Sequence, residues 1–164
     1  MIDKTGASWT GSERSDIEAY LAEYTATEEA YPATAFHPIA CRCGSDRFKV
    51  VRARSTTQRT CLSCGEVRYI CRDGDPIHWS EEVDEENPEP YTCADCRGNA
   101  VNVCLGFAGY PEKPGLNAVK WFYVGVRCCR CGALGCFNSG KVGRRPMTAE
   151  VFSQVAGLST RTVP

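Results

Sequence analysis

The chain has 164 residues, twelve of them cysteine, and a formal net charge of −1. Residues 1–15 are polar and no apolar run approaches about 18 residues, which argues against a secretory signal and against a membrane-spanning segment. We therefore expect a protein of the reducing, cytoplasmic compartment, where closely spaced cysteines bind metal in preference to forming disulfides.

The near-neutral total conceals segments of strong and alternating charge. Residues 1–40 carry a net charge of −5, residues 41–72 carry +6, residues 73–90 carry −8 and residues 91–164 carry +6. The basic segments could contact nucleic acid, whereas the acidic segment could contact a basic protein or the chain's own basic residues.

The first predicted element is a helix within residues 15–40. Residues 1–14 are rich in Ser, Thr and Gly and are predicted to be disordered. Ser15 and Glu18 have the spacing of a capping box, and the helix should end before Pro32. An apolar stripe at helical spacing follows the cap: Ile17, Tyr20, Leu21 and Tyr24. We expect this stripe to cover a face of a small β module; docking onto a partner is the alternative.

Residues 41–72 contain two cysteine pairs that predict a first metal-bound module. The pairs are Cys41 with Cys43 and Cys61 with Cys64, and 17 residues separate them. A glycine follows each pair, as a tight turn beside a metal requires. Residues 47–53 and 67–71 are rich in β-forming residues, so the pairs should lie at the end of a hairpin. Four thiolates complete a closed, structural Zn²⁺ site, although iron accepts the same ligands.

Residues 73–90 are predicted to be an acidic linker, with eight acidic residues, no basic residue and three prolines. The second module, residues 91–140, then repeats the pattern with wider spacing. Its ligands are predicted to be Cys93, Cys96, Cys128 and Cys131, and 31 residues separate the two pairs. Alternation over residues 100–106 and the aromatic run 118–127 predict a long hairpin, with residues 110–115 at its tip. The two modules thus form an internal repeat.

Residues 141–164 should form a basic loop with Lys141, Arg144 and Arg145, a short helix over residues 148–155 and a loose tail. Four cysteines remain outside the predicted quartets: Cys71, Cys104, Cys129 and Cys136. We interpret them as small buried residues. The alternatives are Cys129 as a ligand in place of Cys128, and Cys71 or Cys136 as a reactive thiol near the metal.

The two histidines have less specific surroundings. His37 precedes Cys41 by four residues and is an alternative metal ligand, whereas His78 is interpreted as a residue of the linker surface. No Ser-His-Asp or Cys-His arrangement and no glycine-rich phosphate loop can be placed on the chain. We therefore expect a protein without enzymatic activity and without a small-molecule substrate.

The two C-x-C or C-x-x-C pairs of each module, with their glycines, resemble the zinc ribbons of transcription and ribosomal proteins. This resemblance implies a β-hairpin fold with two structural zinc sites and frequent binding to nucleic acid or polymerase. The layout of one short helix followed by two ribbons is also similar to uncharacterised bacterial proteins, a similarity that implies no function. The expected fold class is a small, metal-stabilised, mainly β protein with two zinc-ribbon hairpins and short N-terminal and C-terminal helices.

These features predict a zinc protein that acts by macromolecular recognition. Nucleic-acid binding is assigned to basic residues of the first module: Arg47, Lys49, Arg52, Arg54 and Arg59. The alternative to nucleic-acid binding is a solvated basic face that pairs with the acidic linker of the same chain. A competing function is a protein-interaction adaptor, or an inhibitor or immunity-type protein, that uses residues 81–89 against a basic partner. Thiol-redox or metal sensing by the spare cysteines is a third alternative.

Overall fold

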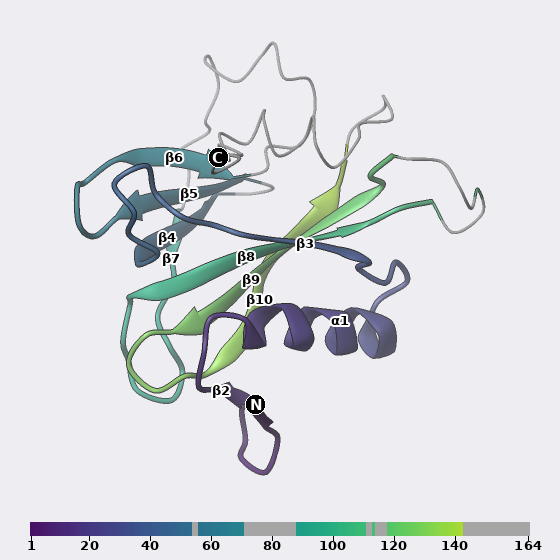
Figure 1. Cartoon of the computed structure of the whole chain (residues 1–164), viewed down its shortest axis with the longest axis horizontal. Helices are drawn as coiled ribbons and strands as arrows, with labels where there is room; N and C mark the ends of the chain where they lie inside the picture. The colour runs from purple at the N-terminus through teal and green to yellow at the C-terminus, as the bar shows by residue number, and fades with distance from the viewer. Residues whose placement is uncertain (54–55, 71–87, 111–112, 114–117, 143–164) are drawn as a thin grey trace, which may run out of the picture.

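The computed structural model describes residues 1–53, 56–70, 88–110, 113 and 118–142. Within these residues the chain is mainly antiparallel β-sheet with one helix (Figure 1). The elements are β1 (Ile2–Asp3), β2 (Thr10–Gly11), α1 (Asp16–Glu28), β3 (Ala35–Pro38), β4 (Phe48–Ala53), β5 (Thr56–Cys61), β6 (Val67–Ile70), β7 (Glu89–Pro90), β8 (Val101–Ala108), β9 (Trp121–Cys128) and β10 (Leu134–Lys141). No helix in this part of the chain has the length and apolar character needed to cross a membrane.

The two predicted modules share one sheet. Its strand order is β10-β9-β8-β4-β5-β6, and we name β4, β5 and β6 the first unit and β8, β9 and β10 the second unit. Strand β3, which leads into the first unit, pairs with β8 of the second, and β7, which leads into the second unit, pairs with β4 of the first. The last residues of the predicted acidic linker therefore form a strand of the sheet.

The internal repeat is confirmed as a pseudo-two-fold symmetry of backbone hydrogen bonds. Phe48 and Val101, each five residues beyond the second cysteine of its pair, are paired directly with each other. Around this pair, the Ile39 amide donates to Val103 O at 2.9 Å, and at the equivalent place the Tyr91 amide donates to Val50 O at 3.0 Å. Each unit therefore pairs with the short strand that leads into the other unit: β7 pairs with the first unit, and β3 pairs with the second.

The inner faces of the two units pack against each other and form a common core. Their side chains alternate along each strand, as the β pattern predicts. The buried apolar residues of this core include Phe48, Val50 and Ile70 from the first unit and Val103, Leu105, Phe122 and Val124 from the second. Asn138 Nδ2 also donates to Thr57 Oγ1 at 3.0 Å between β10 and β5. The core therefore belongs to both units.

Helix α1 covers the opposite face of the second unit, as the apolar stripe predicts (Figure 1). Ile17 and Leu21 are fully buried and lie on glycines of the sheet. A Cβ on Gly125 would come within 2.7 Å of Ile17 Cγ2 and of Leu21 Cδ1. The absence of a side chain at this position allows the helix to approach the sheet closely.

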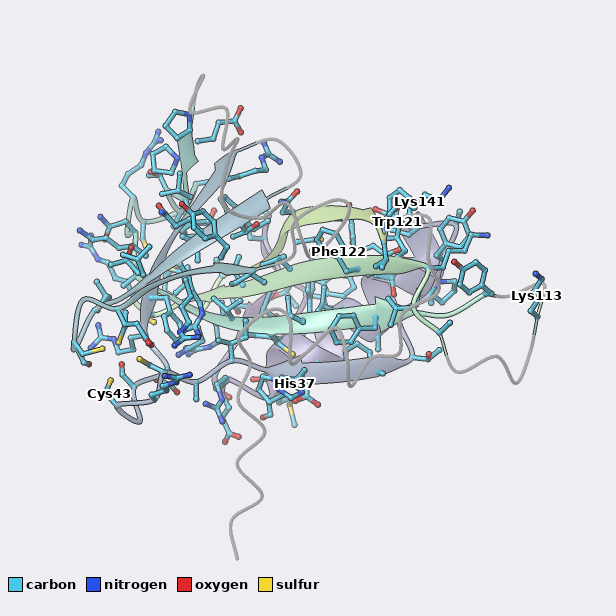
Figure 2. The ribbon with its side chains drawn as sticks, turned by 90° about the horizontal axis from the view of Figure 1, so that it is seen from above. His37, Cys43, Lys113, Trp121, Phe122 and Lys141 are labelled. Carbon is cyan, nitrogen blue, oxygen red and sulfur yellow. The ribbon has the colours of Figure 1, made fainter. Side chains whose placement is uncertain are left out.

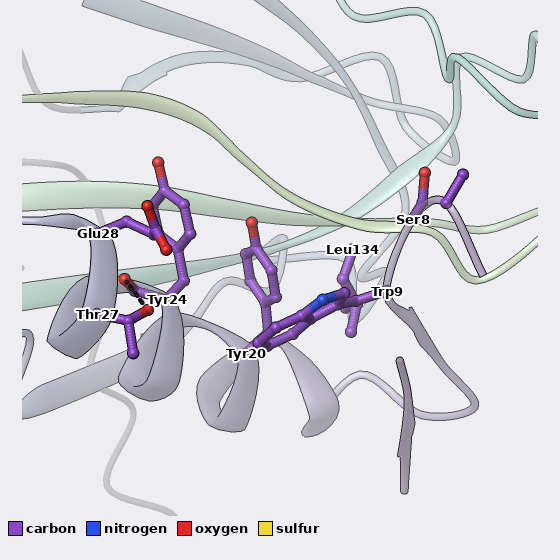
Figure 3. Close-up of a pocket in the computed structure, with 8 residues that line it drawn as sticks. Ser8, Trp9, Tyr20, Tyr24, Thr27, Glu28 and Leu134 are labelled. Atoms are coloured by element: carbon purple, nitrogen blue, oxygen red, sulfur yellow. Dashed lines mark hydrogen bonds between the residues drawn. The ribbon is translucent and has the colours of Figure 1, made fainter. Parts of the chain in front are cut away.

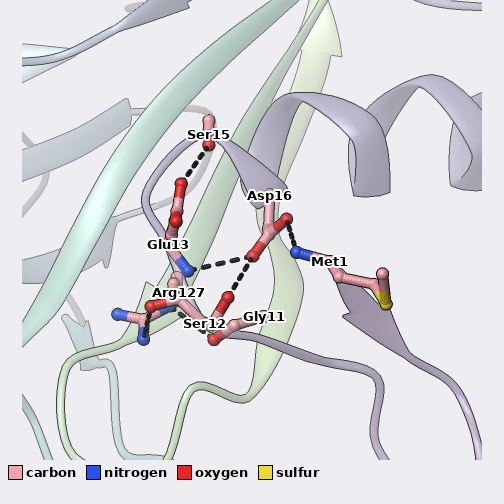
Figure 4. Close-up of polar contacts among 7 residues, drawn as sticks. All are labelled: Met1, Gly11, Ser12, Glu13, Ser15, Asp16 and Arg127. Carbon is pink, nitrogen blue, oxygen red and sulfur yellow. Dashed lines mark hydrogen bonds and ion pairs between the residues drawn. The ribbon is translucent and has the colours of Figure 1, made fainter.

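The predicted capping box is wrong, because Ser15 is in the α region and its side chain makes no capping hydrogen bond. The carboxylate of Asp16 stabilises the start of the helix instead, accepting from the Glu13 amide at 2.9 Å (Figure 4). The terminal ammonium of Met1 also pairs with Asp16, and both contacts lower the pKa of that carboxyl.

The prediction of disorder over residues 1–14 is also wrong. Strands β1 and β2 pair with each other, and the segment then runs beside the start of β10. The Gly11 amide donates to Gly132 O at 2.9 Å, and the Leu134 amide donates to Trp9 O at 2.7 Å. Arg127 donates to the carbonyl of Gly11 at 2.7 Å (Figure 4). Long-range backbone pairing orders a segment whose composition is typical of a loop.

Strands β3, β5 and β10 were not predicted as strands: β3 is short and ends in proline, β5 is mostly polar, and β10 contains two glycines. The predicted basic loop begins inside β10, which extends to Lys141. Arg144, Arg145 and the predicted helix over residues 148–155 lie outside the described residues, as do the acidic residues 73–87.

Candidate metal centres

The cysteine pairs lie in tight turns at the ends of the strands. In the first unit the Gly44 amide donates to Cys41 O and the Gly65 amide donates to Cys61 O, each at 2.9 Å. These turns require the left-handed region, and φ is 89° at Gly44, 75° at Gly65 and 79° at Gly132. The fourth turn has Arg97 at the position equivalent to Gly44, with φ of 62°. The glycine requirement inferred from the sequence therefore holds in three of these four turns.

The turns bring the predicted sulfurs together in two quartets. Within each quartet all Sγ atoms lie within 4.8 Å of one another, in the part of the chain that the structure describes. Two sulfur pairs of the first quartet are 3.5 Å and 3.6 Å apart, and two pairs of the second are each 3.5 Å apart. A tetrahedral ion with Zn–S bonds of about 2.3 Å separates its sulfurs by about 3.8 Å. The donor set fits one thiophilic ion per quartet: Cys41, Cys43, Cys61 and Cys64 for the first, and Cys93, Cys96, Cys128 and Cys131 for the second.

Each quartet has an inner side and an outer side. Cys41 and Cys61 are buried while Cys43 and Cys64 are exposed, and in the second quartet Cys93 and Cys128 are buried. Four thiolates fill a tetrahedral shell and leave no position for water or substrate. An ion held in this way would stabilise the fold, and the thiolates would supply all of its ligands.

Backbone amides favour the thiolate form of one buried cysteine in each quartet. Burial raises the pKa of Cys61, but amide hydrogen bonds from Cys64 and Ser63 outweigh it and lower the pKa to about 6. Burial likewise opposes the amides of Cys96 and Asp95 at Cys93, whose pKa is lowered to about 7. Metal binding requires deprotonated thiols, so these amides prepare one ligand of each quartet for an ion. The pKa is raised at five of the other ligands, so their protons must be displaced by the ion: Cys41, Cys43, Cys64, Cys128 and Cys131.

The surroundings of the two quartets differ. Beside the second, the Gly98 amide donates to Cys96 Sγ at 3.4 Å and Arg130 Nη1 donates to Cys96 O at 3.1 Å. Beside the first, the Cys41 thiol donates to Glu66 Oε2 at 3.3 Å, and Arg68 Nη2 pairs with Glu66 Oε1 at 2.8 Å. A carboxylate–guanidinium pair therefore contacts a sulfur of the first quartet directly, whereas the cation beside the second quartet contacts a backbone carbonyl.

Three further cysteines of the described chain, Cys104, Cys129 and Cys136, lie outside both quartets. Cys104 is fully buried behind α1, and burial raises its pKa to about 12. Burial has the same effect on the half-buried Cys136, whose pKa is also raised to about 12. Cys129 lies at the turn and its amide donates to Ala100 O, while Cys128 supplies the sulfur of the quartet. Cys71 lies outside the described residues.

Neither histidine belongs to a described quartet. His37 lies in β3 opposite Leu105, and burial lowers its pKa. His78 falls outside the described residues. Figure 2 shows Cys43 at one end of the molecule and Lys113 at the other, so the first quartet is distant from the tip of the second hairpin.

The basic residues predicted to bind nucleic acid separate into different environments. Arg47 and Lys49 are exposed. Arg52 pairs with Glu89, its Nε donating to Oε2 at 3.1 Å. This contact is the pairing of a basic residue with the chain's own acidic segment that was the alternative to nucleic-acid binding. Arg59 is only 2% exposed, so its guanidinium is directed into the protein and away from solvent. Arg54 lies outside the described residues.

A pocket of about 360 Å³ lies between the N-terminal segment and α1 (Figure 3). Trp9, Tyr20 and Tyr24 supply its aromatic lining, Leu134 adds an apolar surface, and Glu28 is its one carboxylate. Trp9 and Tyr20 meet edge to face and Tyr20 stacks on Tyr24, each with ring centroids 5.5 Å apart. These contacts anchor the N-terminal segment to the helix.

The chain was compared with protein-family models, with curated proteins and with solved structures, and none of the three comparisons found a match. The two cysteine quartets, each positioned to bind a metal ion, are therefore the functional feature established by the fold itself.

Proposed function

We propose that the chain is a protein of two tandem zinc ribbons that binds single-stranded nucleic acid through one face of the first unit. The zinc would be structural, and a reducing, cytoplasmic setting would keep its ligands as thiolates. The observation that carries the binding proposal is an exposed sheet face on which cations and apolar side chains are combined.

This surface, the outer face of the first unit, is defined by the strand register. Lys49 is paired with Thr60, which is paired with Val67. Val51, Gln58 and Tyr69 form the next row, and Gln58 Nε2 donates to the Tyr69 hydroxyl at 3.4 Å. Arg47 and Leu62 continue the face toward the cysteine turns, since the Leu62 amide donates to Arg47 O. None of these strand positions carries a carboxylate.

The outer face exposes an unusual amount of apolar surface. Leu62 is 40% exposed, Val67 is 51% exposed and Tyr69 is 37% exposed, and apart from Met1 these are the exposed large hydrophobic residues of the described chain. Arg47 and Lys49 are exposed beside them. Aromatic stacking and phosphate contacts from adjacent cations are the two components of single-strand recognition on sheet surfaces.

The internal symmetry supports a partner at this face. The equivalent face of the second unit is covered by α1, which buries Cys104 and Leu134 at the positions corresponding to Val51 and Val67. In the first unit these positions are only half-buried or exposed. We therefore assign nucleic-acid binding to Arg47, Lys49 and Tyr69. Arg59, which the sequence had suggested, is excluded because it is buried.

Fluorescence anisotropy of the metal-loaded full chain with labelled single-stranded RNA and DNA of about 12 nucleotides tests the proposal. Tyr69→Ala should weaken binding by roughly 5- to 150-fold, as expected for loss of about 1–3 kcal/mol of stacking, whereas Tyr69→Phe should retain binding. Lys49→Ala should weaken binding and reduce the salt dependence by about 0.7 in the logarithmic slope.

Lys113→Ala, a change at the far end of the molecule, is the control and should have little effect. Absence of binding at low salt would remove the proposal. Capture of a basic protein, lost when residues 81–86 are neutralised, would instead support the adaptor or inhibitor function. The pairing of Glu89 with Arg52 engages one acidic residue of this segment and one basic residue of the first unit within the protein, so it favours neither partner.

A further inference from the structure

The inner face of the first unit carries charge beside its quartet, and the same positions of the second unit do not. Equivalent positions of the two units are defined by the strand register. Cys61 is paired with Phe48 in the first unit, and Cys128 is paired with Val101 at the same place in the second. The equivalent residues are Arg59 and Val126, Glu66 and Ala133, and Arg68 and Gly135. At these inner positions two positive charges and one negative charge distinguish the first metal centre, whereas Arg130, the cation described above beside the second quartet, is exposed.

Arg59 is the most unusual of these residues. Its side chain is 2% exposed, and its Nε and Nη1 atoms are buried without a hydrogen-bond partner. The guanidinium carbon lies 4.8 Å from the ring centroid of Phe48, a contact that offsets part of the cost of burial. A buried cation without a nearby negative charge is strongly destabilising. The fold therefore requires a negative charge close to Arg59.

The cysteine quartet provides that charge. Arg59 lies on β5 two residues before the buried ligand Cys61, so the two side chains are on the same inner face of the strand. Arg68, paired with Arg59 across the strands, donates to Glu66, and Glu66 in turn contacts the Cys41 thiol. The Nε atom of Arg68 is also buried without a partner. A continuous charged cluster thus connects the inner face to the sulfurs.

We propose that Arg59 and Arg68 neutralise the first metal centre and make it bind its ion more tightly than the second. Four thiolates and one divalent ion carry a formal charge of −2. The two guanidinium groups together with Glu66 add +1 at buried or half-buried positions. The equivalent Val126, Gly135 and Ala133 carry no charge, and Arg130 beside the second centre is exposed, so water and salt screen its charge. The positive charge stabilises the thiolates, and the thiolates supply the negative charge that buried Arg59 requires. This inference rests on the proposed metal binding and is independent of nucleic-acid binding.

The test uses the full chain loaded with cadmium-113, whose two tetrathiolate ions give separate NMR resonances. Correlation to the cysteine β-protons assigns each resonance to its quartet, and a chelator titration measures each affinity. In the wild-type protein the second centre should lose its ion first. Arg59→Met should weaken the first centre by about 10- to 100-fold, the range typical of residues that support metal ligands, with the second centre unchanged.

Arg59→Lys, which keeps the charge, should retain most of the affinity. Val126→Met, the matched change in the second unit, should leave the relative affinities of the centres as they are. Arg68→Met provides an independent variant at a less buried position and should also weaken the first centre selectively.

Equal loss at both centres, or no loss in Arg59→Met and Arg68→Met, would overturn the inference. So would a wild-type protein in which the first centre releases its ion first. A wild-type protein that binds no cadmium would overturn the proposed metal sites as well as this inference. Failure of the inference alone is recognised because both ions then bind but the arginine variants do not weaken the first centre selectively.

Discussion

The contact between α1 and the second unit depends on one glycine, and replacing it gives a sharp prediction. In Gly125→Ala the new methyl group would lie 2.7 Å from Ile17 Cγ2, 2.7 Å from Leu21 Cδ1 and 2.9 Å from Leu21 Cγ. All three distances are shorter than carbon contacts tolerate, so the helix must move outward. Gly135, on the adjacent strand β10, is the matched control, because a Cβ there would meet no atom within 4 Å.

The two substitutions should change the free energy of unfolding in opposite directions. Replacing glycine by alanine in a strand stabilises by about 0.5–1 kcal/mol when space is available, and Gly135→Ala should gain this amount. Forcing a methyl group into a packed core costs about 1–3 kcal/mol. Gly125→Ala should therefore lose up to about 2.5 kcal/mol after the same gain is subtracted.

Urea unfolding of the metal-loaded variants, followed by far-ultraviolet circular dichroism, measures both changes. Leu21→Ala alone should cost about 2–5 kcal/mol, because it leaves a cavity beneath the helix. Combined with Gly125→Ala, the total cost should be less than the sum, since the new methyl group occupies part of that cavity. Stabilisation by Gly125→Ala, or strict additivity with Leu21→Ala, would refute the packing described for α1.

Three further predictions concern the metal centres and the spare cysteines. Arg97→Gly should stabilise the protein by up to about 1 kcal/mol in thermal unfolding, because Arg97 has a φ of 62° where the equivalent turn has glycine; a loss of stability would contradict this. Cys104 and Cys136, whose pKa values burial raises to about 12, should remain unmodified by iodoacetamide at pH 8 in the folded protein and react after unfolding, as site-resolved mass spectrometry would show. Because the pKa of Cys61 is lowered to about 6, the stabilising contribution of its thiolate is complete above the ordinary thiol pKa of about 8.5 and is lost as the pH falls through about 6. Thermal unfolding of the metal-free protein should therefore show a loss of stability as the pH falls through about 6, and a stability that stays constant over this range would contradict the assignment.

Local chemistry explains what could be predicted from the sequence. The pairs around Cys41 and Cys61, with glycine at the turn, specify the geometry of each sulfur within a few residues of chain. The apolar stripe of α1 is likewise a local pattern and predicted the face that the helix buries. The alternation over residues 100–106 predicted a strand, but β8 is buried on both faces because α1 covers the second one. The internal repeat was visible because both units use the same order of cysteine turns and strands.

Long-range pairing decided the remainder. The exchange of β3 and β7 between the units pairs residues that are 37 to 72 positions apart in the sequence, and no local pattern predicts it. Pairing beside β10 orders the N-terminal segment, and the register of β5 with β4 and β6 turns Arg59 inward, although an arginine in a polar strand suggested a surface cation. The sequence by itself determined where the sulfurs converge, because turn geometry is local. The tertiary structure alone determined which charges face them and which sheet face remains exposed, because strands distant in sequence must pair before either is defined.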